Sequence, residues 1–158
     1  MSNFVTFTKQ EIVTFHTGIL SISNELDRDG ILNPSSLDAA LSAPMLTFGG
    51  TDIYPDVLSK IGALMFEIIT LHPFVEGNKR TGFLCADMLM ILNDRVLIAS
   101  DEERTAIAIS VAKMETDRES LIAWLRIHSI ETVHVRSDSN EAADTMGSSE
   151  NILEVHRE

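Results

Sequence analysis

The residues best suited to chemistry lie in one short stretch of the chain, which reads HPFVEGNKRT over residues 72–81. It begins with His72, and histidine is the side chain whose ordinary titration near neutral pH suits it to take a proton. Glu76 follows four residues later, and carboxylate oxygen is a ligand that Mg²⁺ prefers. This stretch therefore combines a candidate general base with a candidate metal ligand.

The second half of the stretch is suited to binding phosphate. A helix is predicted to begin at Gly77 and Asn78, and the free N–H groups at a helix start, with the positive end of the helix dipole, bind anions. Lys79 and Arg80 add two cations to the first turn, where that dipole disfavours positive charge. A bound phosphate would offset these charges, so the combination is typical of phosphoryl transfer.

Two strongly apolar helices are predicted on either side of this stretch. The first covers 57–71 and is apolar around most of its circumference, which places it at the centre of the core. Pro73 ends it, because a proline disfavours helix in the residue before it. The second covers 78–93. A polar, glycine-containing turn between two core helices must lie at an open end of the core.

Further helices follow from capping patterns, in which Ser or Thr stands three residues before Glu. These patterns predict helices over 8–23, 100–114 and 116–130, and a shorter helix fits 35–41. The apolar face expected for the first of them is Ile12, Phe15, Ile19 and Ile22. The predicted fold class is therefore all-α.

The segment 44–55 interrupts the helical pattern. Gly49-Gly50 suits a two-residue turn, which needs positive φ, so a β-hairpin is predicted in which Phe48 faces Thr51. Two interpretations stay open: a surface connection, or an exposed strand edge that accepts a target peptide by strand addition. The residues of this candidate flap are Thr47, Phe48, Gly49, Gly50, Thr51 and Asp52.

Length and charge limit the classes of function. The chain has 158 residues, about one domain, and we place a domain over 1–133 and an acidic, flexible tail over 134–158. The formal net charge of −12 argues against direct nucleic-acid binding and against binding to anionic membrane surfaces. The sequence shows no secretory signal and no apolar run long enough for a membrane helix. We therefore expect a cytoplasmic protein.

Several remaining residues are assigned to structure. Cys85 is the single cysteine and reads as a core residue, as does Trp124. His16 is assigned to packing or to the surface. The other histidines lack metal-ligand spacing, so no zinc site is expected.

The stretch HPFVEGNKRTG resembles the signature of the Fic/Doc family, whose adenylylating members read H-P-F-x-[DE]-G-N-G-R-x-x-R. The likeness extends over most of residues 5–130, with a helical core and a hairpin flap that positions the substrate. The matching signature positions are His72, Pro73, Phe74, Glu76, Gly77, Asn78 and Arg80. The resemblance implies an enzyme that uses ATP and Mg²⁺ to modify a hydroxyl of a protein.

Two departures favour the death-on-curing (Doc) branch of that family. Lys79 stands where the adenylylating signature has glycine, and Phe83 stands where it has a second arginine. In this branch the resemblance implies transfer of the γ-phosphoryl group of ATP to a Ser or Thr hydroxyl of a translation factor, by a toxin that a separate antitoxin controls. Because Pro73 and Gly77 belong to the adenylylating pattern, AMP transfer stays open, as does a catalytically silent, partner-binding module.

The resemblance also implies a role for each site residue. His72 takes the proton of the target hydroxyl, and Glu76 holds Mg²⁺. The remaining four residues bind the phosphates: Gly77, Asn78, Lys79 and Arg80. The family's inhibitory helix, S/T-x-x-x-E-[GN], is absent, because Met146 precedes Glu150-Asn151 where Ser or Thr is required.

Overall fold

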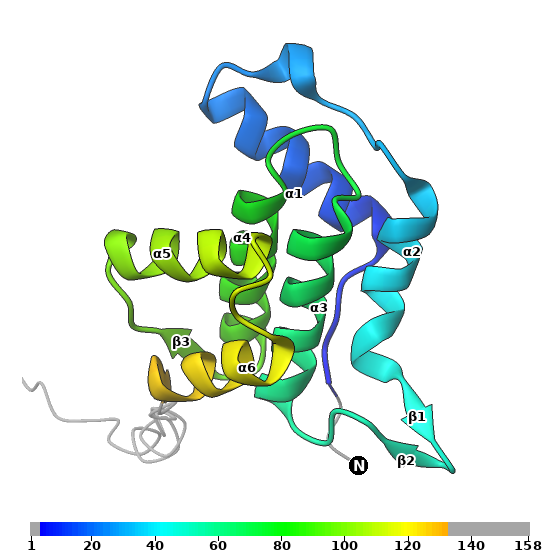
Figure 1. Cartoon of the computed structure of the whole chain (residues 1–158), viewed down its shortest axis with the longest axis vertical. Helices are drawn as coiled ribbons and strands as arrows, with labels where there is room; N and C mark the ends of the chain where they lie inside the picture. Colours follow the sequence, from blue (N-terminus) through cyan, green and yellow to red (C-terminus); the bar gives the residue numbers. More distant parts are fainter. Residues whose placement is uncertain (1–3, 133–158) are drawn as a thin grey trace, which may run out of the picture.

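The computed structural model of the chain describes residues 4–132, and within this range the fold is all-α with two short strand pairs (Figure 1). The helices are α1 (Lys9–Ile22), α2 (Pro34–Ser42), α3 (Val57–Leu71), α4 (Asn78–Leu92), α5 (Asp101–Ala112) and α6 (Arg118–Ile127), with short 3₁₀ turns at Leu26–Arg28 and Ala43–Met45. The predicted fold class is confirmed. The tail expected over 134–158 lies outside the described residues.

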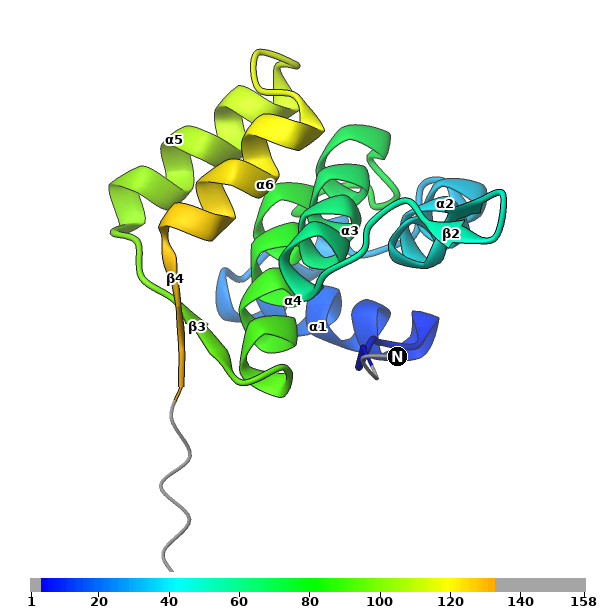
Figure 2. The ribbon, with the colours of Figure 1, turned by 90° about the horizontal axis from the view of Figure 1, so that it is seen from below.

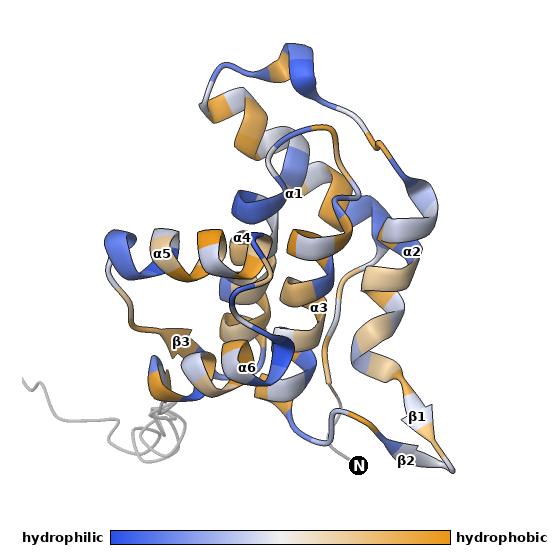
Figure 3. Cartoon of the chain, viewed as in Figure 1, coloured by the Kyte–Doolittle hydropathy of each residue, from blue (hydrophilic) through white to orange (hydrophobic). Residues whose placement is uncertain are grey.

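Helix α3 is the centre of the molecule, as its apolar circumference predicts. Eleven of its 15 residues are buried. It packs against α4, α2 and α6, while α1 packs against α4 on the other side. Figure 3 shows hydrophobic residues along both central helices, and hydrophilic ones in the first turn of α4. The loop between α3 and α4 therefore emerges from the core at one end of the helix pair (Figure 1).

Side-chain caps start most of these helices. Thr8 and Ser100 form the predicted capping boxes with Glu11 and Glu103. The prediction for the last helix was wrong at both ends: Asp117, not Thr116, is its cap, and the helix ends at Ile127. Asp117 accepts a hydrogen bond of 2.8 Å from the Ser120 amide, and a carboxylate in this position also suits the helix dipole.

Residues 129 and 130, predicted as the end of the last helix, lie instead in a strand. Strand β3 (Arg95–Leu97) pairs antiparallel with β4 (Ser129–Glu131), so that Val96 lies opposite Ile130. This pair follows α4 and α6 and ties their C-terminal ends together. Figure 2 shows it beside α5 and α6, which form a layer on one side of the α3–α4 pair. Three-residue strands carry too little alternation to be recognised from sequence.

The predicted hairpin is present with the predicted register. Strand β1 (Thr47–Phe48) pairs with β2 (Thr51–Asp52), Phe48 faces Thr51, and both turn glycines have positive φ. The hairpin is anchored at its base by Lys60 in the first turn of α3. The buried Nζ of Lys60 donates to the Pro44 carbonyl and to Asp52, each at 3.0 Å.

The apolar face of α1 differs from the prediction. Its buried residues are Ile12, His16 and Leu20, which follow one another at four-residue intervals, whereas Ile22 is 91% exposed. The fully buried face therefore passes through His16 and Leu20 rather than through Phe15, Ile19 and Ile22. In residues 4–132, none of these helices has the length and apolar character that crossing a membrane requires.

Candidate active site

His72 lies exposed at the end of α3, in a backbone conformation that few residues adopt. It is the C-cap of the helix, with φ 48° and ψ 58°, in the left-handed region. Histidine tolerates this region better than most residues, but the conformation still costs free energy and persists where the surroundings impose it. The result is an imidazole that projects from the end of the core into solvent.

The loop after His72 is held by its own side chains. Phe74 is 1% exposed and anchors the loop in the core, as expected. The side chain of Asn78 accepts a hydrogen bond from the Phe74 amide at 3.0 Å and donates one to the Phe74 carbonyl at 2.9 Å. We expected this side chain to contact a phosphate oxygen. In the structure these two hydrogen bonds hold the loop, and the contact with a phosphate oxygen stays a prediction.

The segment Gly30–Asn33 runs along the other side of the loop. The Leu32 and Asn33 amides donate to the Pro73 carbonyl, and the Val75 amide donates to the Gly30 carbonyl. Ile31 and Phe74 form an antiparallel bridge. A short extended segment is therefore paired directly with the loop that carries His72.

The hairpin lies far from this loop. It precedes the first residue of α3, whereas His72 follows the last, and Figure 1 shows the two at opposite ends of the helix. A helix of this length spans about 22 Å. The sequence-based expectation that the hairpin aligns a target at His72 is not supported by this geometry, and Gly30–Asn33 is the extended segment that lies beside the site.

Helix α4 begins without a side-chain cap, which sets it apart among the helices of residues 4–132. Thr8, Asn33, Asp56, Ser100 and Asp117 cap the other five, whereas Gly77 is the N-cap of α4. Gly77 has φ 77°, and an added Cβ would meet Leu20 Cδ2 at 3.3 Å. A glycine N-cap leaves the first-turn amides to another partner, which favours an anion at this position.

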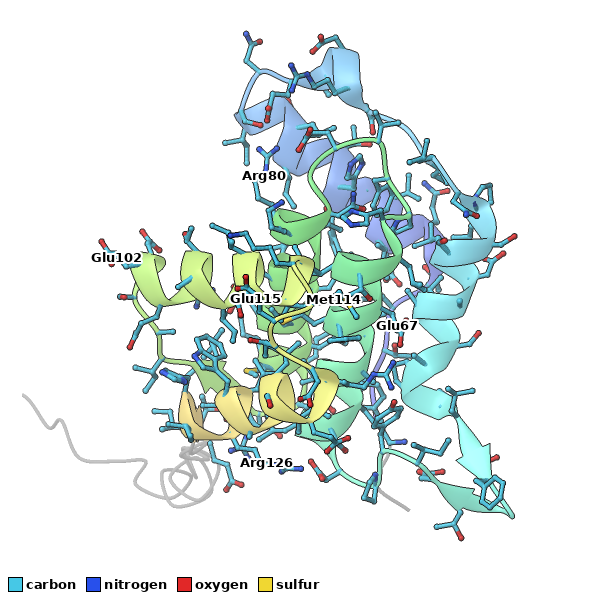
Figure 4. All side chains as sticks on the ribbon, viewed as in Figure 1. Glu67, Arg80, Glu102, Met114, Glu115 and Arg126 are labelled. Carbon is cyan, nitrogen blue, oxygen red and sulfur yellow. The ribbon has the colours of Figure 1, made fainter. Side chains whose placement is uncertain are left out.

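The two cations of the first turn are both exposed, but only one is engaged by an ion pair in the structure. Arg80 donates to the Ser23 hydroxyl at 2.7 Å and pairs with Glu25 at 2.8 Å, at the end of α1 (Figure 4). The Ser23 hydroxyl and the Arg80 guanidinium hold the pKa of the Glu25 carboxyl below its ordinary value. Lys79 has no ion pair among the described residues.

Glu76 suits a metal that arrives with the nucleotide rather than a metal held by the protein alone. Its side chain is 45% exposed, and Oε1 accepts a hydrogen bond from the Gly77 amide at 3.2 Å. No cluster of three metal-ligating side chains occurs within residues 4–132. Mg²⁺ is commonly held by one or two carboxylates plus substrate phosphates, and one accessible carboxylate beside an anion site fits that pattern.

A groove of about 720 Å³ adjoins the cations but not the base. Lys79 and Arg80 line it, together with apolar residues of α1, α4 and α5, whereas His72 and Glu76 do not. Phe83, at the position of the family's second arginine, lies in its floor and is 9% exposed. The groove therefore adjoins the first turn of α4 but does not reach His72 or Glu76.

The sequence assigned His16 to packing or to the surface, and its polar contact with the loop was not expected. It is fully buried and its ring stacks on Phe74, with centroids 3.9 Å apart. Its Nε2 lies 2.8 Å from the Glu76 carbonyl oxygen. Its four-residue spacing from Ile12 and Leu20 is the signal that could have placed it in the core, and a buried histidine needs polar partners.

Comparison with known proteins tests the family resemblance of the sequence. The sequence model of the Fic/DOC family matches residues 6–90, more than half of the chain, including the loop and most of α4. The chain belongs to the Fic/DOC family. Among curated proteins, the toxin Doc of Mycolicibacterium smegmatis is 32% identical over an alignment of 116 residues that covers 63% of this chain and 89% of that protein.

Fic/DOC membership accounts for the order of the elements around the loop. The matched region runs from the approach to α1 through α4, so it contains both helices that hold the loop and the extended segment beside it. Helices α5 and α6 lie beyond it. Fic/DOC proteins in general are transferases that use ATP with a metal ion to modify proteins, and likeness to a toxin Doc places the chain with the Doc branch.

Proposed function

We propose that this protein is a toxin-type kinase that transfers the γ-phosphoryl group of ATP to a Ser or Thr hydroxyl of a protein target. The observation that carries the proposal is the start of α4: a glycine N-cap and two cations, directly after an exposed histidine held in a left-handed conformation. A translation factor is the proposed target, by resemblance to the Doc branch.

His72 is the proposed general base. The target oxygen attacks the γ-phosphorus, an O–P bond forms, and the bond from that phosphorus to the bridging oxygen of ADP breaks. The hydroxyl proton passes to the His72 imidazole, which is exposed and has no hydrogen bond or ion pair to another described residue. Because α3 and the paired loop fix its backbone, the imidazole needs little rearrangement to meet the hydroxyl.

The start of α4 binds the phosphates in this proposal. The amides of Asn78 and the residues after it, with the charges of Lys79 and Arg80, stabilise negative charge on the transferring and leaving groups. Glu76 would hold Mg²⁺, which supplies neutralising charge on the nucleotide phosphates. Arg80 reaches a phosphate only when it leaves Glu25, so this ion pair competes with nucleotide binding.

Two residues favour the γ over the α phosphate. Lys79 occupies the place where adenylylating relatives have glycine, and its side chain fills space that a phosphate would use while offering a charge of its own. Phe83 is nearly buried under the Arg104 guanidinium and against Trp124, so it cannot hold a phosphate. This position therefore lacks the second arginine of the adenylylating signature.

AMP transfer is the second candidate function, and Gly77 favours it. The glycine adopts φ 77°, a left-handed conformation that glycine takes readily, and the adenylylating signature has glycine at this position. In that case the same base and cations act on the α-phosphorus, and pyrophosphate leaves.

The target is proposed to dock beside Gly30–Asn33. Leu32 is 64% exposed and Val75, within the loop, is 53% exposed, so apolar side chains flank the base on the accessible side. A target strand placed here would present its hydroxyl close to His72. The protein is proposed to act in the cytoplasm under the control of a separate antitoxin, since the similar M. smegmatis protein is named a toxin.

The test is to incubate the protein with Mg²⁺, cell extract and ATP labelled at either the α or the γ phosphate. The proposal predicts label in protein only from the γ position, and none from either position with the His72→Ala variant. Label from the α position alone would establish AMP transfer instead. Unchanged transfer by His72→Ala would overturn the role of the base, and circular dichroism would verify that the variant is folded.

A further inference from the structure

His16 is a fully buried histidine to which the proposed chemistry gives no task. It lies on α1, 60 residues before Glu76 in sequence, and yet it contacts the loop twice. Its Nε2 is 2.8 Å from the Glu76 carbonyl oxygen, and its ring lies nearly parallel to that of Phe74, with an interplanar angle of 9°. A histidine this far inside the protein is costly unless its polar atoms are used.

The partners of the ring fix its orientation. A carbonyl oxygen only accepts hydrogen bonds, so the proton of the imidazole that faces Glu76 must lie on Nε2. On the opposite side Nδ1 lies 3.0 Å from Asp29 Oδ1, at an ion-pair distance but without the alignment of a hydrogen bond. Asp29 in turn accepts a hydrogen bond of 2.9 Å from the Thr17 hydroxyl. The ring is therefore held by Nε2 at one edge and by Phe74 on its face, with the Asp29 carboxylate against the other edge.

We propose that His16 is a positioning residue of the site, which clamps the Glu76–Gly77 peptide through Nε2–H and thereby orients the Glu76 carboxylate and the first amides of α4. This inference rests on the proposed function, because it assigns Glu76 to the metal and the α4 amides to phosphate. His16 touches neither nucleotide nor target in this account.

Rotation of the Glu76–Gly77 peptide would disturb the proposed site more than rotation of any other peptide in the loop. This peptide joins the metal carboxylate to the glycine N-cap, and Gly77 has no side chain to restrict its backbone. The space around Gly77 is occupied by α1: an added Cβ would lie 3.6 Å from His16 Nε2. Rotation of this peptide would turn the Glu76 side chain and the Gly77 amide together. Residues that orient metal ligands in this way typically change metal affinity by ten- to a hundredfold when removed.

His16 also contacts the two chain segments that border His72. Asp29, on one side of the ring, immediately precedes the segment Gly30–Asn33, and Glu76, on the other, lies in the loop paired with that segment. One side chain from α1 thus contacts both. A purely apolar residue could fill the same space against Phe74, so the polar contacts point to orientation rather than packing.

The experiment compares His16→Phe, which keeps an aromatic ring against Phe74 but removes Nε2–H, with His16→Gln, whose amide can still donate to the Glu76 carbonyl. Hydrogen exchange of the loop amides at 74–78 is measured without nucleotide or target, and the Mg²⁺ dependence of ATP binding is measured calorimetrically. His16→Phe should exchange on the order of tenfold faster at 77 and 78 and need about tenfold more Mg²⁺, whereas His16→Gln should stay near wild type.

His128→Phe is the matched control. That histidine stacks on Trp124 and its Nδ1 lies 2.8 Å from the Trp124 carbonyl, so the same substitution removes the same kind of contact elsewhere. If His16→Phe does not fold, His16→Gln is compared with His16→Asn, whose shorter side chain cannot reach Glu76.

The proposal is overturned if the Phe and Gln variants change equally, or if His16→Phe matches the control in both measurements. If His16→Gln and His16→Asn are the variants compared, equal hydrogen exchange in the loop likewise overturns the proposal. Hydrogen exchange of the loop does not depend on catalysis. Absence of phosphoryl transfer in the wild-type protein would therefore refute the proposed function, and the exchange data would still test whether His16 holds the loop.

Discussion

Arg80 has Ser23 and Glu25 as partners in the structure, whereas the proposed function gives it a phosphate, so the two sets of contacts are expected to compete. In the structure it is bound by Ser23 and Glu25 at the end of α1, 2.7 and 2.8 Å away. The proposed function requires the same guanidinium at a phosphate. An ion pair that solvent screens in this way contributes little to stability, so it is expected to tune binding without preventing it.

The variant Glu25→Gln is therefore expected to bind Mg²⁺–ATP more tightly, by up to about fivefold, because the arginine is no longer held by a carboxylate. Calorimetric titration measures the change. Asp38→Asn is the control, since Asp38 pairs with Lys9 away from the site and loses the same charge. Equal affinities in Glu25→Gln and Asp38→Asn would show that the ion pair does not compete with nucleotide.

Position 77 requires glycine because its backbone is left-handed and because Leu20 leaves little room for a side chain. The variant Gly77→Ala places a side chain at φ 77° and 3.3 Å from Leu20, so we expect it to lose about 1–2 kcal/mol of unfolding free energy. Urea denaturation measures this loss. Gly18→Ala provides the contrast, because Gly18 lies within α1 with nothing within 4 Å of an added Cβ, and alanine there should stabilise the helix. A Gly77→Ala protein as stable as wild type would contradict this view of the loop.

The sequence is enough to single out the candidate catalytic and ligand-binding residues. It does not reveal the residues that hold the loop in place. His72, Glu76 and the cations are neighbours along the chain, so their spacing alone brings them together. His16 and Asp29 reach the loop only through tertiary packing, and nothing local in the sequence indicates it. Asn78 could be recognised as important, but only the structure shows its amide committed to Phe74.

At the scale of elements, the extended segment that lies beside the loop of His72 is 30–33, not the hairpin. The hairpin is an obvious sequence feature because Gly49-Gly50 marks its turn, whereas Gly30–Asn33 carries no comparable signal and is extended only because it pairs with Pro73 and Val75. Helix α3 then separates the hairpin from the base by about 22 Å. Chain connectivity alone shows that the hairpin and His72 lie at opposite ends of α3. It does not show that the segment at 30–33 packs beside His72, because that contact depends on tertiary pairing.

This placement predicts different effects for two exposed apolar residues. The variant Leu32→Ser should raise KM for the protein target several-fold with little change in kcat, because it removes apolar surface beside the base. Phe48→Ser, at the hairpin turn and 85% exposed, should leave both constants unchanged. Steady-state phosphorylation of the target measures both. A larger loss from Phe48→Ser would restore the hairpin as the target-positioning element.

At the scale of the whole molecule, the strong negative charge and the phosphate chemistry are compatible because the cations are local. The chain carries 24 acidic and 12 basic residues, yet Lys79 and Arg80 stand together at one helix start. The overall field disfavours polyanions such as nucleic acid. One nucleotide, held by a helix end, two cations and a metal, is much less affected by that field.

Nucleotide binding should therefore stabilise the whole fold. At tenfold excess over Kd, Mg²⁺–ATP is expected to add about 1.4 kcal/mol and raise Tm by a few degrees. The shift should survive in His72→Ala, which leaves the phosphate site intact, and shrink in Glu76→Gln. Glu115→Gln, an exposed residue labelled in Figure 4 and distant in sequence from the loop, is the charge-matched control. No shift at millimolar nucleotide would instead favour a catalytically silent binding module.

The most direct test of the central claim is the intact mass of the modified target after reaction with the wild-type protein and with His72→Ala, in Mg²⁺ and ATP. We predict that wild type adds the mass of one phosphoryl group at a Ser or Thr and that His72→Ala adds nothing. Addition of an adenylyl group, or a phosphoryl group added equally by both proteins, would contradict γ-phosphoryl transfer by His72.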